Sequence, residues 1–296
     1  MFTKVARRFV KPELDVGREQ RVRRTYDRDR GYERYHAVCR RSLSREVPEA
    51  ATPLQEGGVE RIRVMSEAGA AALREQVHRR FRSESFRNNG DRVFEYRLDD
   101  PVFARSLLAT VLTRGVDERV TQFFRSEYFV HWFVVNQAMP RPDENFNSFL
   151  WHCDRGPRMH LKLLVYLNGV DEHDVCTEFL DLSTTRDVAR SGYLFGRVAD
   201  RRADLGPLAE RVGAKFEPRS WRLTGGEALL FQPSNVLHRG VMPRRAARTM
   251  LAICLLPSPV PWREALARGV MSDLARDPKW HRDAMDVARG LGFADR

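Results

Sequence analysis

From residue 128 onward the chain is dominated by short apolar and aromatic runs separated by Gly, Pro, Asn or Asp. Runs of this length and composition, bounded by turn-forming residues, are typical of β-strands. Several such strands with few helices between them indicate an antiparallel sandwich or barrel. The predicted strands are 128–138, 149–154, 159–167, 175–182, 227–232 and 249–256. The sequence therefore predicts a mainly β fold with flanking helices.

Helices are predicted on either side of this strand-rich region. Apolar positions at helical spacing favour three of them before it, at 68–80, 101–113 and 117–127, the first opened by a capping Ser66. Two stretches between the strands, 183–220 and 233–247, show neither helical spacing of apolar residues nor strand-like apolar runs. The first is too long for a simple hairpin, and a loop of that size is usually functional.

The chain divides into three predicted parts. Residues 1–50 are an Arg-rich, charge-alternating segment, which we interpret as a basic N-terminal extension. A joint rich in Pro and Gly leads into the main domain, 51–260. Residues 261–296 form a predicted helical tail, with Trp262, Leu266 and Val270 at helical spacing. This tail packs either on the barrel or on a second subunit, so a homodimer is one alternative.

Two histidines and an aspartate at strand ends form the most specific pattern of chemistry-bearing residues. His152 and Asp154 are two positions apart in a predicted strand, with one residue between them, so their side chains point to the same face. His238 follows the strand at 227–232, and Arg248 opens the next one. Two nitrogens and one oxygen on one face of a metal leave open positions, a set typical of non-haem Fe(II) oxygenases. The nearby guanidinium suits an organic carboxylate.

These residues make the chain resemble the Fe(II)/2-oxoglutarate-dependent dioxygenases, and among them the phytanoyl-CoA hydroxylase-like branch. The matching segments read WHCD at 151–154, LKLLVYLNGVD at 161–171, GEALLFQ at 226–232 and LHRG at 237–240, followed by Arg248. Upstream, 56–77 is similar to the helix entry before the barrel in that branch. The resemblance covers roughly 55–260. It implies a double-stranded β-helix, the jelly-roll or cupin-like barrel.

The resemblance also implies roles for the four residues. His152, Asp154 and His238 would hold Fe(II), while 2-oxoglutarate and O2 would take the remaining positions on the metal. Arg248 would bind the distal carboxylate of 2-oxoglutarate, where a bidentate guanidinium suits better than a point charge. The cosubstrate would be converted to succinate and CO2. Because related halogenases carry a small residue at the position of Asp154, the carboxylate there favours hydroxylation or desaturation.

Five further residues are candidates for the site, each with a structural alternative. Lys162 rivals Arg248 as the carboxylate partner, as a Lys from this region does in some other branches. Asn136 is placed to hydrogen-bond the cosubstrate, or to serve the fold. Tyr166 reaches the same pocket, or is a core aromatic. Arg155 and Arg158 bind an anionic substrate, or are solvated loop charges.

Composition bounds the partners. The net charge of +11 suggests an anionic partner, yet only five of the 51 basic residues are Lys, and the Arg are spread among 40 acidic residues. The leading hypothesis is a small-molecule substrate, and an anionic one would agree with the positive net charge. No apolar run approaches the roughly 20 residues needed to cross a bilayer, and we expect a cytoplasmic protein. The four cysteines lack zinc-site spacing; 153, 176 and 254 lie in apolar runs and are expected to be buried.

Two other functions stay open. The same chemistry on nucleic acid or protein is one alternative, motivated by the charge. The nucleic-acid demethylase branch usually has a second Arg six residues beyond the cosubstrate Arg, and that position is Cys254 here. A non-catalytic, metal-binding cupin-like module is the other alternative. The chain also departs from the resemblance at 183–186, which reads STTR, and in the insertion around 186–220. The substrate itself is not predicted.

Overall fold

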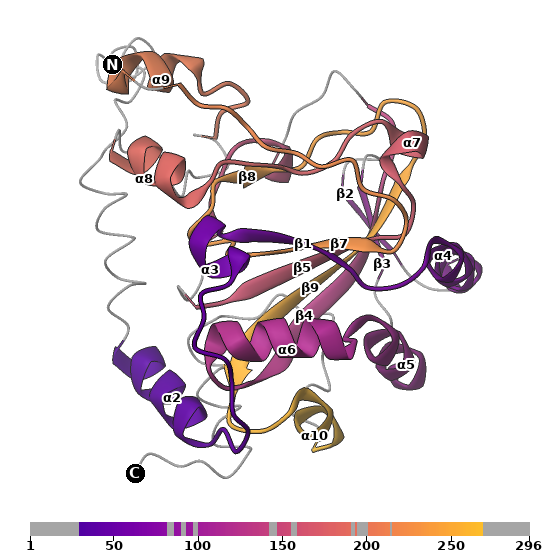
Figure 1. The fold of residues 1–296 in the computed structure, drawn as a ribbon. Coiled ribbons are helices and arrows are strands. Elements are labelled where there is room, and N and C mark those ends of the chain that lie inside the picture. Colours follow the sequence, from indigo (N-terminus) through magenta and orange to yellow (C-terminus); the bar gives the residue numbers. More distant parts are fainter. Residues whose placement is uncertain are drawn as a thin grey trace, which may run out of the picture.

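A large antiparallel sheet forms the centre of the protein, seen here in a computed structural model. The model describes residues 30–81, 86–89, 93–96, 100–141, 147–154, 159–190, 193, 201–213 and 215–268. One face of the sheet is covered by helices, and the other faces a small second sheet with its own helices (Figure 1). This arrangement confirms the predicted mainly β fold with flanking helices.

The seven strands of the large sheet are not in sequence order. Every neighbouring pair is antiparallel. The order across the sheet is β1 (Val59–Arg63), β7 (Glu227–Phe231), β5 (Leu161–Tyr166), β9 (Arg248–Ser258), β4 (Glu127–Ala138), β3 (Val93–Tyr96) and β2 (Phe86–Asn89). The second sheet pairs β6 (Glu178–Phe179) with β8 (His238–Arg239). Strands predicted at 128–138, 159–167, 227–232 and 249–256 are therefore present.

The helices lie in two groups on opposite sides of the large sheet (Figure 1). On one side lie α2 (Arg30–Arg41), α4 (Glu67–Phe81), α5 (Pro101–Val111), α6 (Arg114–Phe124) and α10 (Trp262–Ala267). The other side carries α7 (Val170–His173), α8 (Leu182–Arg190) and α9 (Gly206–Val212), and α3 (Pro53–Gly57) precedes β1. The helices α4, α5 and α6 correspond to the three predicted before the strand-rich region.

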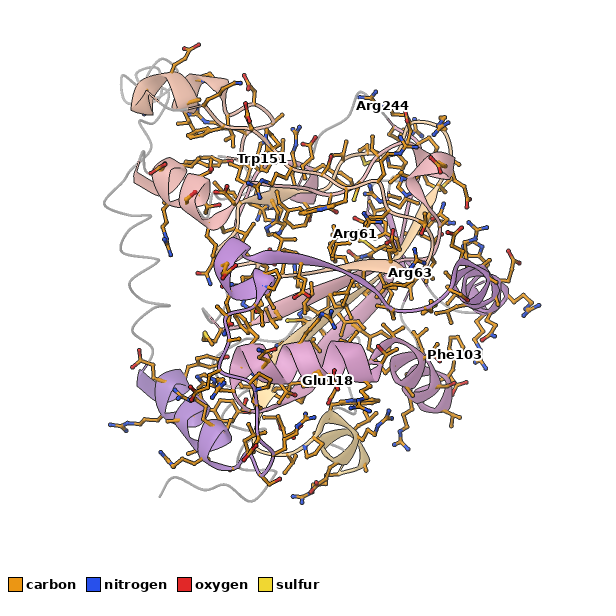
Figure 2. The ribbon with its side chains drawn as sticks, viewed as in Figure 1. Arg61, Arg63, Phe103, Glu118, Trp151 and Arg244 are labelled. Atoms are coloured by element: carbon orange, nitrogen blue, oxygen red, sulfur yellow. The ribbon has the colours of Figure 1, made fainter. Side chains whose placement is uncertain are left out.

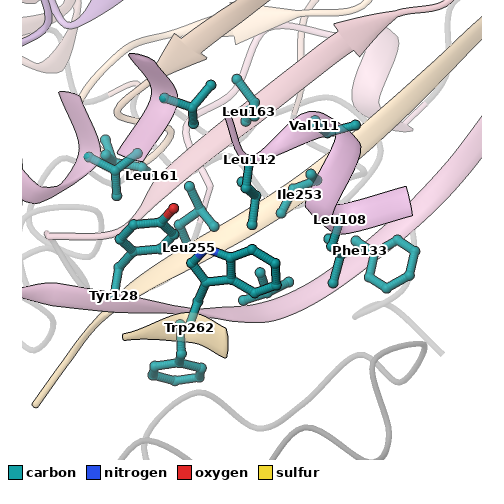
Figure 3. Close-up of a cluster of buried hydrophobic side chains, with 14 of the residues drawn as sticks. Leu108, Val111, Leu112, Tyr128, Phe133, Leu161, Leu163, Ile253, Leu255 and Trp262 are labelled. Atoms are coloured by element: carbon teal, nitrogen blue, oxygen red, sulfur yellow. The ribbon is translucent and has the colours of Figure 1, made fainter. Parts of the chain in front are cut away.

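The central strands present one set of side chains to the helices and another to the second sheet. Alternate residues of a strand point to opposite faces. The main hydrophobic core lies between the sheet and the helices, and Figure 3 labels Leu161 and Leu163 of β5, Ile253 and Leu255 of β9, and Leu108 and Val111 of α5 within it. The intervening residues, such as Leu164 and Ala252, belong to a second cluster on the other face. The candidate site lies on that second face.

An irregularity in β4 sets which of its residues face the candidate site. The register against β9 shifts between Val130 and Trp132, as expected for a β-bulge. Beyond this point Phe133 and Val135 belong to the main core. Their neighbours 132, 134, 136 and 138 all line a cavity on the other face. The bulge therefore directs this row of alternate side chains toward the cavity.

Several predicted elements differ in the structure. The segment 149–154 is not a strand: its backbone pairs only through isolated bridges, Trp151 with Arg202 and His152 with His238. The strand predicted at 175–182 is reduced to β6, because only two residues find a partner there. The interval 183–220, expected to be irregular, contains most of α8 and all of α9. Apolar composition alone does not show whether a run has a neighbouring strand to pair with.

The two ends of the described chain pack on the main core. In α2, which lies within the predicted N-terminal extension 1–50, Tyr35 and Cys39 are buried members of the main cluster. Trp262 and Leu266 of α10 join the same cluster, so the beginning of the tail packs on the sheet, one of its two alternatives. Cysteines 39, 153, 176 and 254 are all free and buried, as predicted for the last three. Within the described residues, no helix is both long and apolar enough to span a bilayer.

Candidate metal centre

A reciprocal backbone contact holds His152 and His238 side by side. The His152 amide donates to the His238 carbonyl at 3.0 Å, and the His238 amide donates back at 2.9 Å. Their imidazole ring centroids lie 4.5 Å apart. Two histidines separated by most of the strand-rich region therefore meet through one antiparallel bridge. The bridge lies at His238, the first residue of β8.

Each of these imidazoles is oriented by a carbonyl of its own chain segment. The Nδ1–H of His152 donates to the Leu150 carbonyl at 2.7 Å, and that of His238 donates to the Val236 carbonyl at 2.9 Å. A carbonyl accepts only, so these bonds place the proton on Nδ1 and leave the Nε2 lone pair available in both rings. Metal-binding histidines are commonly fixed in this way.

Asp154 completes a three-residue group with these imidazoles. Its amide donates to the Pro233 carbonyl at 2.8 Å, which ties the segment to the turn before His238. Its Oδ1 lies 3.5 Å from Nε2 of His152 and 3.9 Å from Nε2 of His238. One ligand atom from each of the three residues lies within 4.8 Å of the others. Two nitrogens and one oxygen so gathered are a donor set that holds a first-row transition metal.

Burial and neighbouring charges keep His238 and Asp154 suited to bind a cation. Burial, with a contribution from His152, lowers the pKa of His238 to about 3, so its ring is neutral, as a ligand must be. Burial alone raises the pKa of the Asp154 carboxyl, but the charge of the Lys162 ammonium outweighs it and holds that pKa well below its usual range. Asp154 and Lys162 form an ion pair through Oδ2 and Nζ.

A cavity of about 240 Å³ extends from the two histidines along the sheet. Arg248 also lines it, with a side chain that is 3% exposed. The guanidinium donates to the Val241 carbonyl at 2.8 Å and to the Val175 carbonyl at 3.5 Å. No carboxylate pairs with Arg248 among the residues the structure describes. A buried cation without an acidic partner is costly, so this site favours an anionic ligand.

The remaining predicted site residues have different outcomes. Asn136 and Lys162 line the cavity. Tyr166 is fully buried in the wall and is not among the lining residues; its hydroxyl contacts Thr177 Oγ1 at 2.8 Å, and Thr177 does line the cavity. The candidates at 155 and 158 lie outside the described residues. Tyr166 is therefore a buried aromatic behind the cavity wall, the structural alternative, and does not itself reach the pocket.

Sequence reasoning misses several polar or aromatic residues that line the cavity, among them Thr177, Trp132 and Glu95. Thr177 and Trp132 lie in segments whose pattern indicates a strand and nothing more. Glu95 belongs to β3, a strand absent from the predicted set. A signal for that strand exists, because Asn89-Gly90 separates two short runs with strand-forming residues and this dipeptide is typical of hairpin turns.

Solved structures share this fold. The non-heme alpha-ketoglutarate-dependent epimerase SnoN from nogalamycin biosynthesis superposes with a TM-score of 0.50 at 12% identity, covering 76% of this chain and 80% of that one. EctD from S. alaskensis with bound Fe also gives 0.50, at 13% identity over 72% and 78% of the two chains. No protein-family model and no curated protein sequence matches the chain. At these identities the likeness establishes the fold alone.

Proposed function

We propose that this protein is an Fe(II)/2-oxoglutarate-dependent oxygenase of the phytanoyl-CoA hydroxylase-like branch. The observation that supports it best is the convergence of His152, Asp154 and His238, with both Nε2 atoms available. The large sheet facing a small second sheet supports the double-stranded β-helix within this proposal. Because α2 packs on the core, we extend the proposed domain 51–260 back to include Arg30–Arg41.

Each residue of the site has a proposed task. His152, Asp154 and His238 hold Fe(II) on one face, and Fe(II) with 2-oxoglutarate and O2 supplies the oxidising chemistry, releasing succinate and CO2. Arg248 binds the distal carboxylate of 2-oxoglutarate. Lys162, the rival for that role, is already paired with Asp154, whereas Arg248 has no acid among the described residues. Asn136 lines the same cavity and orients the cosubstrate by donating its Nδ2–H.

The shape of the site favours a small-molecule substrate over nucleic acid or protein. The cavity of about 240 Å³ is smaller than most ligand pockets, which measure roughly 300–1,000 Å³, so it suits compact organic molecules. Cys254, at the position where a nucleic-acid demethylase would have its second Arg, is fully buried. With a carboxylate at Asp154, the proposed outcome is hydroxylation or desaturation.

Spectroscopy of the loaded protein tests the proposal without a known substrate. Anaerobic addition of Fe(II) and 2-oxoglutarate should give a metal-to-ligand charge-transfer band in the visible. The variants His152→Ala and Asp154→Ala should lose it, because each removes a ligand. Asp171→Ala, an acid that is 76% exposed on α7, is the matched control and should retain the band. Absence of the band in the wild-type protein contradicts the proposal and favours the non-catalytic module.

Turnover is the second test. A metabolite-pool screen should reveal compounds that stimulate succinate release in the presence of Fe(II), 2-oxoglutarate and O2. Mass spectrometry of the product distinguishes hydroxylation, about 16 Da heavier, from desaturation, about 2 Da lighter. Oligonucleotides that stimulate release more strongly than any small molecule, with steep salt dependence, would instead support the nucleic-acid alternative.

A further inference from the structure

The wall of the cavity formed by β3 and β4 carries three polar atoms or groups that the proposed function does not use: the Glu95 carboxylate, Asn136 Oδ1 and Trp132 Nε1. Glu95 is half-buried and lines the cavity from β3. Among the described residues it forms no ion pair or hydrogen bond. On β4, Asn136 Oδ1 and Trp132 Nε1 are buried atoms that have no hydrogen-bond partner in the described part of the chain. Native proteins rarely leave such atoms unsatisfied, and the exceptions often mark a place where a ligand binds.

The sheet register brings two of these acceptors together. Glu95 is the direct partner of Asn136 in the pairing of β3 with β4, and Asn136 is in turn opposite Met250 of β9. Side chains of directly opposed residues on one face lie about 4.5–5.5 Å apart at Cβ. A carboxylate and an amide oxygen are thus neighbours on the wall, while Trp132 and Met250 supply apolar surface on the same side of the cavity.

Among the described side chains that line the cavity, no cation is left to pair with Glu95. The Lys162 ammonium is paired with Asp154. The Arg248 guanidinium is assigned to the cosubstrate. A ligand that covers Glu95 removes water from a carboxylate, and a neutral hydroxyl would leave that charge unpaired. A protonated amine satisfies both the charge of Glu95 and the acceptor Asn136 Oδ1, although it cannot accept from the Trp132 Nε1–H.

We propose that the substrate of this site carries a protonated amine, which is bound by the Glu95 carboxylate with Asn136 Oδ1 as the second acceptor. This inference rests on the proposed oxygenase function and names the substrate class for it. Trp132 and Met250 contact the carbon skeleton next to the amine. Glu95 is then a specificity-determining residue, remote from the metal ligands in sequence and supplied by a strand at the edge of the site.

Binding of matched compound pairs tests the inference. The probes are putrescine, phenethylamine and glucosamine, each compared with its N-acetyl derivative, which keeps the skeleton and loses the charge. The full chain, loaded anaerobically with Fe(II) and 2-oxoglutarate, is titrated while ligand-observed NMR and the charge-transfer band are recorded. At least one amine should bind more tightly than its N-acetyl partner, on the order of 10- to 100-fold for a charge-assisted hydrogen bond.

Variants connect this preference to Glu95. Glu95→Gln should abolish the preference while leaving the band with 2-oxoglutarate unchanged, and Glu95→Asp should keep most of it. Glu118→Gln is the control: Glu118 lies on α6, in the helical layer on the far side of the sheet from Trp151 (Figure 2). Its side chain is 55% exposed.

The outcomes separate the two proposals. A band without any amine preference in the wild-type protein contradicts the amine inference alone, and requires no variant. The amine inference is also contradicted if Glu95→Gln binds amines as the wild type does. Absence of the band contradicts the oxygenase function itself.

Discussion

At the scale of the residue, Arg248 has the most unusual environment in the site. It is almost fully buried, donates to two carbonyls and has no acidic partner among the described residues. We predict that Arg248→Lys weakens 2-oxoglutarate binding on the order of 10- to 100-fold, because an ammonium cannot reproduce the planar fork of donors. Anaerobic titration of the charge-transfer band measures the dissociation constant.

The matched control for this prediction is Arg245→Lys. Arg245 is close in sequence, but its side chain is 57% exposed and lies near Asp174. This variant should bind 2-oxoglutarate as the wild type does. Equal affinity in Arg248→Lys and the wild type would show that the cosubstrate carboxylate is held elsewhere, with Lys162 the next candidate.

The sequence is a good guide to this site where a motif fixes the spacing. His152 and Asp154 are close in the chain, and His238 with Arg248 follows a fixed order of strands, so their convergence could be predicted. The position of Glu95 in the site could not be predicted, because its place beside Asn136 depends on the register between two strands. Nor does the sequence reveal that Tyr166 lies behind Thr177 rather than in the cavity.

At the scale of the element, β5 and its neighbours depend on close packing against the helices. Leu163 is completely buried in the main core. Leu163→Ala should lower the free energy of unfolding by about 2–5 kcal/mol, because it removes buried methyl groups and leaves a cavity. Val102→Ala, at an exposed position of α5 (73% exposed), should change it by no more than about 0.5 kcal/mol. Urea denaturation measures both; similar midpoints would contradict the assigned core.

The connection from α3 to β1 requires glycine at one position and tolerates substitution at the one before it. Gly58 has φ of +80°, and a Cβ there would lie 2.4 Å from Val236 Cγ2. Gly58→Ala should therefore destabilise the fold by roughly 1–3 kcal/mol. It should also weaken metal binding, since the Val236 carbonyl orients His238.

The neighbouring glycine provides the control. A Cβ at Gly57 would meet nothing within 4 Å, so Gly57→Ala should be neutral or slightly stabilising. Thermal denaturation and Fe(II) titration of the two variants give the comparison. A Gly58→Ala protein with wild-type stability would show that the segment 234–238 can move to admit the methyl group.

Elements with regular patterns were predictable, and elements that depend on a distant partner were not. Three helices and four long strands follow from apolar periodicity. The segment 149–154 has the same apolar composition, but only the bridges to Arg202 and His238 pair with it. A short apolar run does not reveal whether a full ladder is available.

At the scale of the whole molecule, buried histidine makes stability depend on pH. Burial, together with the charge of His160, lowers the pKa of His131 from 6.5 to about 4. Between these values the unfolded chain binds a proton that the folded protein does not, so the stabilisation is complete above pH 6.5 and is lost as pH falls toward 4. The loss should amount to roughly 3 kcal/mol.

Urea unfolding between pH 4.5 and 7.5 checks this dependence. The variant His131→Gln has no titrating group there, so its free energy of unfolding should fall less steeply with acid than that of the wild type. Parallel curves for the two proteins would show that other groups, not His131, account for the acid sensitivity.

The alternation along β5 and β9 has an evolutionary consequence. One set of residues meets the helices and sustains the fold, and the other, one position along, faces the cavity. Substitutions in the second set can therefore change which ligand binds without changing the residues that pack the core. A lineage built on such strands can diversify in chemistry while its architecture stays the same, even after its sequences have lost all visible kinship.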